Sequence, residues 1–133
     1  MTNDNEQTTK QPTTIREWCA AAYDQSARSG FHDDEKFLRP RERVAVYLIN
    51  LHGEVSEAWE SFRAGTLHEP CDKAEKMKAM GLRPLTCLEE ELADIAIRCF
   101  DTAQAYGLDL QSSIEVKHAY NGTRAARHGG KLA

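Results

Sequence analysis

The sequence predicts an all-α protein, built as a four-helix bundle. Apolar residues recur at intervals of three and four in four separate stretches, which is the spacing of a helix buried along one face. Capping residues precede most of these stretches, and glycines follow them. No stretch alternates polar and apolar residues convincingly over the length of a strand.

Length and composition limit the function further. The chain has 133 residues, enough for one domain with a core and too few for two. Its formal charge of -4 provides no basic field, so we expect no nucleic-acid partner. No apolar run is long enough to cross a bilayer, and the N-terminus lacks the features of a signal peptide, so we expect a soluble, cytoplasmic protein without a membrane partner. The four cysteines form no Cys-x-x-Cys pair, which indicates reduced thiols.

The first helix is expected from Thr14 to about Arg28. Residues 1–13 are polar and predict a disordered N-terminal tail. Thr14 followed by Glu17 matches a capping box, and Ser29-Gly30 ends the helix. The charged stretch 31–39 is expected to be a loop.

The second helix opens at Pro40, a favoured first-turn residue, and runs to about Ala64 before Gly65. Its predicted buried face consists of Val44, Leu48, Leu51, Val55, Trp59 and Phe62. The polar segment 66–86 is an insertion between helices two and three, with a short helix expected around residues 72–80.

A third helix is expected after Thr86, which forms a capping box with Glu89, and it ends at Gly107. Its core face is predicted to hold Leu88, Leu92, Ile95, Cys99, Ala103 and Tyr106. Asp109 caps a fourth helix that runs to about Arg127. The single helical domain is therefore expected to span residues 14–127, followed by a basic, glycine-containing tail at 128–133.

Two acidic motifs occupy matching positions of helices two and three. Glu54-Val-Ser-Glu57 and Glu91-Leu-Ala-Asp94 each place two carboxylates three residues apart, on one side of a helix. If the helices pack together, all four acids can face one groove, where they repel one another unless a cation holds them. Oxygen ligands alone favour Mg2+, with Mn2+ as a substitute, over zinc. The alternative is an ordinary solvated face, in which Arg98 pairs with Asp94.

The fourth helix carries cationic and amide groups on the stripe that begins with Leu110 and Ile114. Lys117, Asn121 and Arg124 continue this stripe, so they are expected to point inward at a group that needs positive charge and hydrogen-bond donors, such as a polyphosphate. Alternatively, they lie at a solvated helix end, where cations suit the helix dipole. Arg127, His128 and Lys131 extend the positive charge. They either close over phosphates or form an ordinary basic tail, and the second interpretation is slightly favoured.

In this order, Glu-x-x-Glu, Glu-x-x-Asp and Lys-x-x-x-Asn-x-x-Arg resemble the MazG-like all-α nucleoside triphosphate pyrophosphohydrolases. The resemblance runs from about Arg43 to Lys131. The segment between Glu57 and Glu91 is longer than in compact members, so the insertion is expected to reshape the substrate pocket or an oligomer contact.

The resemblance implies a helical bundle that assembles as a homodimer or homotetramer. It implies cleavage of a nucleoside triphosphate between the α and β phosphates, releasing a monophosphate and pyrophosphate. Four residues would bind Mg2+ and act in catalysis, one of them helping to deprotonate the attacking water: Glu54, Glu57, Glu91 and Asp94. Three more would hold the phosphates or the sugar: Lys117, Asn121 and Arg124. Among the rings available for the base, Phe31 and His32 are better candidates than Trp18, Tyr47 or Trp59.

Three other interpretations remain open. The acids could belong to a non-catalytic helical interaction module. A carboxylate-bridged di-iron protein would use Glu115-Val-Lys-His118, but that class needs two Glu-x-x-His motifs and the chain has one. Finally, the fold could be retained with the activity lost or the substrate changed to a related pyrophosphate compound.

Overall fold

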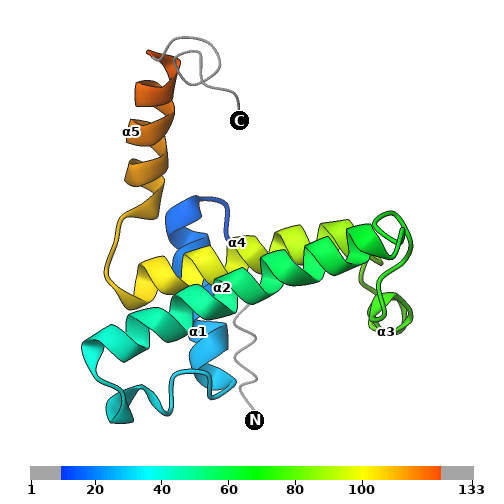
Figure 1. Cartoon of the computed structure of the whole chain (residues 1–133), viewed down its shortest axis with the longest axis horizontal. Coiled ribbons are helices and arrows are strands. Elements are labelled where there is room, and N and C mark those ends of the chain that lie inside the picture. The colour runs from blue at the N-terminus through cyan, green and yellow to red at the C-terminus, as the bar shows by residue number, and fades with distance from the viewer. Residues whose placement is uncertain (1–9, 124–133) are drawn as a thin grey trace, which may run out of the picture.

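The structure, a computed structural model, describes residues 10–123, and every regular element in this range is helical (Figure 1). The elements are α1 (Ile15–Arg28), the 3-10 turn η1 (Glu35–Phe37), α2 (Pro40–Arg63), α3 (Ala74–Ala79), α4 (Cys87–Ala105) and α5 (Leu110–Gly122). The all-α class is therefore confirmed. The tail expected at 1–13 lies mostly outside the described residues, and the tail expected at 128–133 lies wholly outside them. Residues 124–127, which the prediction assigned to the end of the fourth helix, lie outside them as well.

Local capping signals placed the helix starts correctly. The capping box of Thr14 with Glu17 begins α1, and that of Thr86 with Glu89 begins α4. Gly65 and Gly107 follow α2 and α4 with positive φ angles of 72° and 63°, a conformation that glycine adopts without steric cost.

The α4 cap yields a stability prediction. Thr86→Ala removes the hydroxyl that accepts from the Glu89 backbone N–H, so the free energy of unfolding should fall by about 1 kcal/mol. Urea denaturation followed by circular dichroism measures this. Thr66→Ala is a suitable control, because the Thr66 hydroxyl donates to the Ser61 carbonyl after α2 and caps no helix N-terminus.

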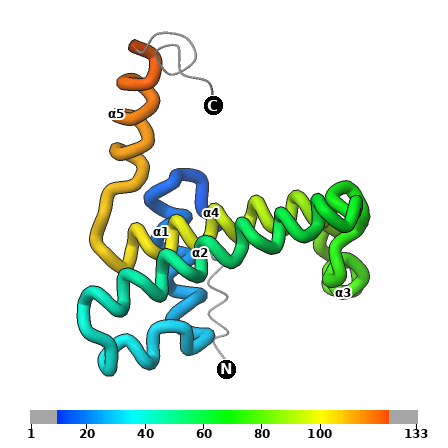
Figure 2. The backbone as a smooth tube through the Cα atoms, viewed as in Figure 1, coloured from blue at the N-terminus to red at the C-terminus, as the bar shows by residue number. Residues whose placement is uncertain are grey.

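The helices α1 and α2 both pack against α4. Figure 2 shows α2 and α4 side by side and antiparallel, with α3 beyond their far end and α1 crossing them. This arrangement brings the first half of α4 beside the second half of α2, where the two acidic motifs lie.

The helix α5 does not complete a four-helix bundle within one chain. It projects from the end of α4 and packs mainly on α1 (Figure 1), where Arg16 donates from Nη2 to Asp109 Oδ2 at 2.9 Å. Apolar side chains of α5 therefore remain exposed, including Ile114 and Val116. Periodicity predicts an apolar face on a helix, but it does not specify what covers that face.

The face of α2 that packs on its neighbours also differs from the prediction. Leu48 and Trp59, expected in the core, are each 57% exposed, and Val44, Val55 and Phe62 are exposed as well. The buried or half-buried stripe is displaced around the helix and consists of Tyr47, Leu51, Glu54, Ala58 and Ser61. On α4, Leu92 is exposed whereas Glu90, Glu91 and Asp101 are buried. The covered sides of the two helices thus include several acidic residues, whereas several of their large apolar side chains are exposed.

The buried apolar side chains of the described part are mostly small. They are Cys19, Ala22, Tyr47, Cys71, Ala74 and Ala103. No large side chain among residues 10–123 is fully buried. No helix in this part of the chain is both long and apolar enough to span a membrane.

Candidate divalent-metal site and adjoining pocket

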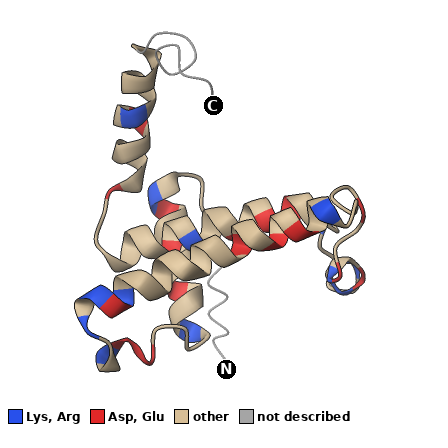
Figure 3. Ribbon diagram, in the orientation of Figure 1, with Lys and Arg blue, Asp and Glu red and all other residues tan. Residues whose placement is uncertain are grey.

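Three of the four predicted acids converge between α2 and α4. One carboxylate oxygen from each of Glu54, Glu57 and Glu91 lies within 4.8 Å of the other two. Glu54 and Glu91 are buried, and Glu57 is exposed at the edge of the group. Figure 3 shows acidic residues along this half of the α2–α4 pair. Because Glu54 and Glu91 are buried, a purely solvated acidic face does not describe them.

Asp94 lies one turn after Glu91 and belongs to the adjoining surface. It is half-buried and, together with Glu54, lines a hollow of about 240 Å³ that Phe31 and Arg98 also border. Asp94 therefore neighbours the three converging acids, although its oxygen atoms are not among those within 4.8 Å of one another.

The negative charge of Glu91 and Asp94 is only partly balanced by neighbouring groups. Glu91 Oε2 is buried and has no hydrogen-bond partner. Burial, and then the charge of Glu57, raise the pKa of Glu91 above its ordinary range. Burial, and then the charge of Glu54, likewise raise the pKa of Asp94. Gathering buried carboxylates without a cation is costly, and oxygen donors suit a hard divalent ion, so these residues fit Mg2+ or Mn2+.

A second group of potential metal ligands already has a lysine of the same chain beside it, which balances its negative charge. Cys71, Asp72 and Glu90 also place ligand atoms within 4.8 Å of one another. Lys73 Nζ, however, donates to Glu90 Oε1 and lies 3.4 Å from Asp72 Oδ1. The hydrogen bond to Glu90 raises the pKa of Lys73, which keeps the ammonium charged. Sequence reasoning missed Lys73 because the insertion carried no motif.

Arg98 provides the cation nearest the three converging acids, and it pairs with a different residue than expected. Its Nε donates to Glu54 Oε1 at 2.8 Å, across the helix interface, rather than to Asp94 on its own helix. Its guanidinium also lies over the ring of Phe31, with 5.4 Å between the guanidinium carbon and the ring centroid. Arg98 thus links the acids to the pocket beyond it.

The predicted phosphate-binding residues lie elsewhere in the single chain. Lys117 and Asn121 are exposed on α5, where they line a shallow hollow with Leu110, Ser113, Ile114 and His118. Arg124 lies outside the described residues. Because α5 projects away, one chain does not bring Lys117 or Asn121 to the acids. Glu115 and His118, the residues of the di-iron alternative, are exposed on this same helix.

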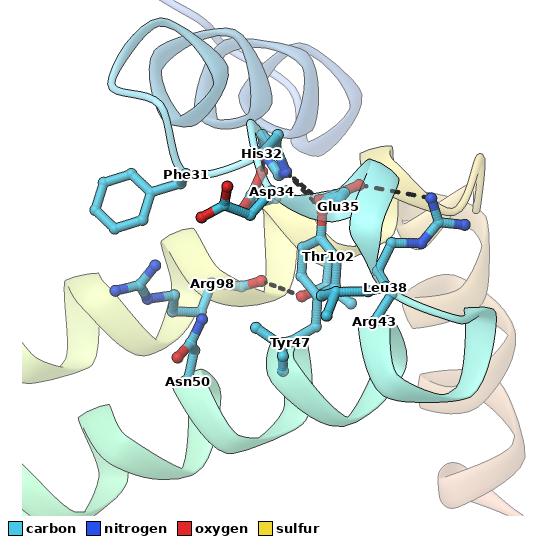
Figure 4. A pocket seen from close by; sticks show the side chains of 12 residues that line it. Phe31, His32, Asp34, Glu35, Leu38, Arg43, Tyr47, Asn50, Arg98 and Thr102 are labelled. Carbon is cyan, nitrogen blue, oxygen red and sulfur yellow. Dashed lines mark hydrogen bonds and ion pairs between the residues drawn. The ribbon is translucent and has the colours of Figure 1, made fainter.

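A pocket of about 280 Å³ opens beside Arg98, between η1, α2 and α4 (Figure 4). Sequence reasoning selected Phe31 and His32 from its lining, but Asn50 and Asp101 carried no recognisable signal. The lining residues are Phe31, His32, Asp34, Glu35, Leu38, Arg43, Val46, Tyr47, Asn50, Arg98, Asp101 and Thr102.

The rear wall of this pocket is a closed hydrogen-bond network around His32. Its Nε2 lies 3.0 Å from Asp101 Oδ1, and its Nδ1 contacts Glu35 Oε1 and, at 2.7 Å, the hydroxyl of Tyr47. Ser26 donates to the other oxygen of Asp101 at 3.1 Å, and the Tyr23 ring stacks on His32. Burial and the Glu35 acceptor raise the pKa of Tyr47, so its hydroxyl stays protonated. The network holds the wall in one geometry.

Fold and site together define an all-α protein with a candidate divalent-cation site beside a preformed pocket. Comparison with protein-family models, curated proteins and solved structures found no significant match to this chain.

Proposed function

We propose that the protein is a Mg2+-dependent nucleoside triphosphate pyrophosphohydrolase that cleaves between the α and β phosphates. The observation that carries this proposal is the convergence of Glu54, Glu57 and Glu91, with one buried carboxylate oxygen left unpaired. A binding surface without a metal would gain nothing from burying like charges together. Mn2+ is expected to replace Mg2+ in the same site.

Each acid has a role that follows from its place. Glu54, Glu57 and Glu91 would hold the ion, and Asp94 would face the hollow where the reacting phosphate lies. When bound, Mg2+ supplies charge neutralisation and a more acidic bound water. Asp94 lines the hollow beside the three converging acids, so we assign the attacking water's proton to Asp94. The Nη atoms of Arg98 remain available to stabilise charge on the phosphates.

The raised carboxyl pKa values predict a pH-dependent affinity for the metal. Glu91 and Asp94 retain protons to a higher pH than free carboxyls, whose pKa is about 4. The ion must displace those protons, so Mg2+ affinity should rise with pH through the acidic range and binding should release protons. Isothermal titration calorimetry in two buffers of different ionisation enthalpy measures this release. Affinity that is independent of pH between about 4.5 and 7 would contradict the assignment.

We further propose that the active form is a homodimer. Large apolar side chains of α2 and Leu92 of α4 are exposed in the single chain. Two copies packed through these side chains would bury them and make an intermolecular bundle of four helices. Packing with the two α2 helices antiparallel would bring α5 of one copy toward the acidic end of the other. Lys117 and Asn121 would then contact phosphates in the neighbouring copy's site. This would explain how they could act in phosphate binding although one chain does not bring them to its own acids.

Product analysis is the direct test of the activity. Purified protein with Mg2+ and a panel of ribo- and deoxyribonucleoside triphosphates should release pyrophosphate and a monophosphate, not orthophosphate. A protein that binds Mg2+ but releases no pyrophosphate would instead favour the non-catalytic interaction module.

Anaerobic Fe2+ loading tests the di-iron alternative, for which an oxo-bridged absorption band after exposure to oxygen would be diagnostic.

A further inference from the structure

We propose that the pocket beside Arg98 binds the nucleobase and selects bases that carry an exocyclic amino group, namely cytosine and adenine over uracil and hypoxanthine. This inference rests on the proposed function, because it concerns the substrate of the same site.

The pocket and the acidic hollow share a border. Phe31 and Arg98 line both the 280 Å³ pocket and the hollow that contains Glu54 and Asp94. In Figure 4, Phe31, Asp34, Arg98 and Asn50 lie on one side of the pocket, opposite Glu35 and Arg43. A nucleotide whose phosphates reach the acids would therefore place its base beyond Arg98, in this pocket.

The opening suits a flat, aromatic ligand. Phe31 is 64% exposed, so its ring is accessible to a flat ligand. Leu38, Val46 and the Tyr47 ring contribute further apolar surface to the pocket. Base stacking on one aromatic ring contributes about 1–3 kcal/mol and does not depend on base identity. Stacking on Phe31 therefore provides affinity, and selectivity must come from polar groups.

The polar groups divide into those already paired and those that are free. His32, Glu35 and Asp101 are hydrogen-bonded among themselves and to Tyr47 and Ser26, so they form a fixed wall. Within residues 10–123, the Asp34 carboxylate and the Asn50 amide have no hydrogen-bond partner, and both are exposed to the pocket mouth.

The free carboxylate determines the expected preference. An ionised carboxylate only accepts hydrogen bonds, whereas an amide both donates and accepts. Asp34 can accept from the amino group of cytosine or adenine, but it repels the carbonyl oxygen at the same position of uracil or hypoxanthine. The Asn50 amide can donate to the unprotonated ring nitrogen beside the amino group of cytosine or adenine. It can equally accept from the ring N–H beside the carbonyl of uracil or hypoxanthine. Asp34 is thus the residue that distinguishes an amino from an oxo substituent.

Two substrate pairs that differ in this substituent test the selectivity. CTP should be hydrolysed with a kcat/KM about tenfold above that of UTP, and ATP should exceed ITP similarly. Asp34→Asn, which introduces donors, should reduce both ratios to about threefold or less. Asp33→Asn is the matched control, because Asp33 is exposed next to Asp34 but does not line the pocket, and both ratios should persist. Equal rates within each pair, or ratios unaffected by Asp34→Asn, would overturn the proposal.

A binding measurement without turnover separates this inference from the proposed function. Titration with CMP and UMP in the absence of Mg2+, followed by amide chemical shifts, should perturb Phe31, Asn50 and Thr102 more strongly with CMP. Absence of pyrophosphate release together with this CMP preference would remove the enzyme assignment and keep the base pocket. Pyrophosphate release with no shift at these residues, or with equal shifts for CMP and UMP, would keep the enzyme assignment and overturn the base pocket.

Discussion

Replacing Glu57 by Gln should abolish measurable pyrophosphate release without unfolding the protein. Glutamine keeps the size of the side chain but removes one of the three converging carboxylates, and Glu57 is exposed, so no buried packing is lost. Changing a residue that merely supports a metal ligand typically costs about 10- to 100-fold, so loss of a ligand should cost at least about 100-fold. The measurement is the rate of pyrophosphate release at saturating Mg2+, together with the circular dichroism spectrum.

A second variant, Glu91→Gln, tests the same metal site through its effect on stability. Glu91→Gln should also abolish activity, yet it should raise the melting temperature of the metal-free protein. The folded-state pKa of Glu91 is raised, so its ionised form destabilises the fold at neutral pH, and the amide removes that charge.

Glu60→Gln is the control for both variants, because Glu60 lies one turn beyond Glu57 on α2 and is exposed. Among residues 10–123, its carboxylate pairs only with Arg63, at 3.5 Å. It should change neither activity nor stability appreciably. Full activity in Glu57→Gln, or a lower melting temperature in metal-free Glu91→Gln, would remove these acids from the site.

Trp59→Asp should convert the protein to a monomer and eliminate its activity. Trp59 is exposed and stacks on Phe62 with 5.1 Å between ring centroids, and both belong to the apolar stripe that we propose two copies bury. A charge at a closely packed apolar interface is strongly unfavourable unless it is paired. Sedimentation velocity measures the oligomeric state. The mutant chain should retain its helical spectrum, because Trp59 contributes little to packing within one chain.

Met80→Asp is the matched control, because Met80 is also a large exposed apolar residue but follows α3, away from this stripe. It should leave both dimer and activity intact.

Mixing Glu57→Gln protein with Lys117→Ala protein provides an independent check. If Lys117 acts in the neighbouring copy's site, the mixed dimer regains one intact site and part of the activity. A wild-type protein that sediments as a monomer while active would contradict the dimer.

Short-range signals in the sequence were sufficient for most of the secondary structure. The capping boxes at Thr14 and Thr86 and the glycines after α2 and α4 place those helix ends, because a cap depends on a few neighbouring residues. The spacing of Glu54 with Glu57, and of Glu91 with Asp94, was also informative, because residues three apart share a side in any helix. The convergence of the three glutamates required only that α2 and α4 pack antiparallel with the motifs side by side.

Longer-range features were not predictable in this way. The sequence pattern led to a buried apolar stripe on α2, but α4 packs instead on the flank that contains Tyr47 and Glu54. Arg98 was expected to pair with Asp94 if it paired at all, yet it pairs with Glu54 across the interface. The pocket at Asn50 and Asp101 arises from three elements meeting, and none of them carries a motif.

The chain's own sequence therefore specifies five helices within residues 10–123, their caps and the two acidic motifs, because each depends on contacts between near neighbours. Only the tertiary structure decides which face of each helix is covered, that α5 leaves the α2–α4 pair and contacts α1, and that Arg98 joins the acids to a pocket around His32. The physical reason is that an apolar face lowers its free energy against any complementary surface, so periodicity alone does not identify the partner.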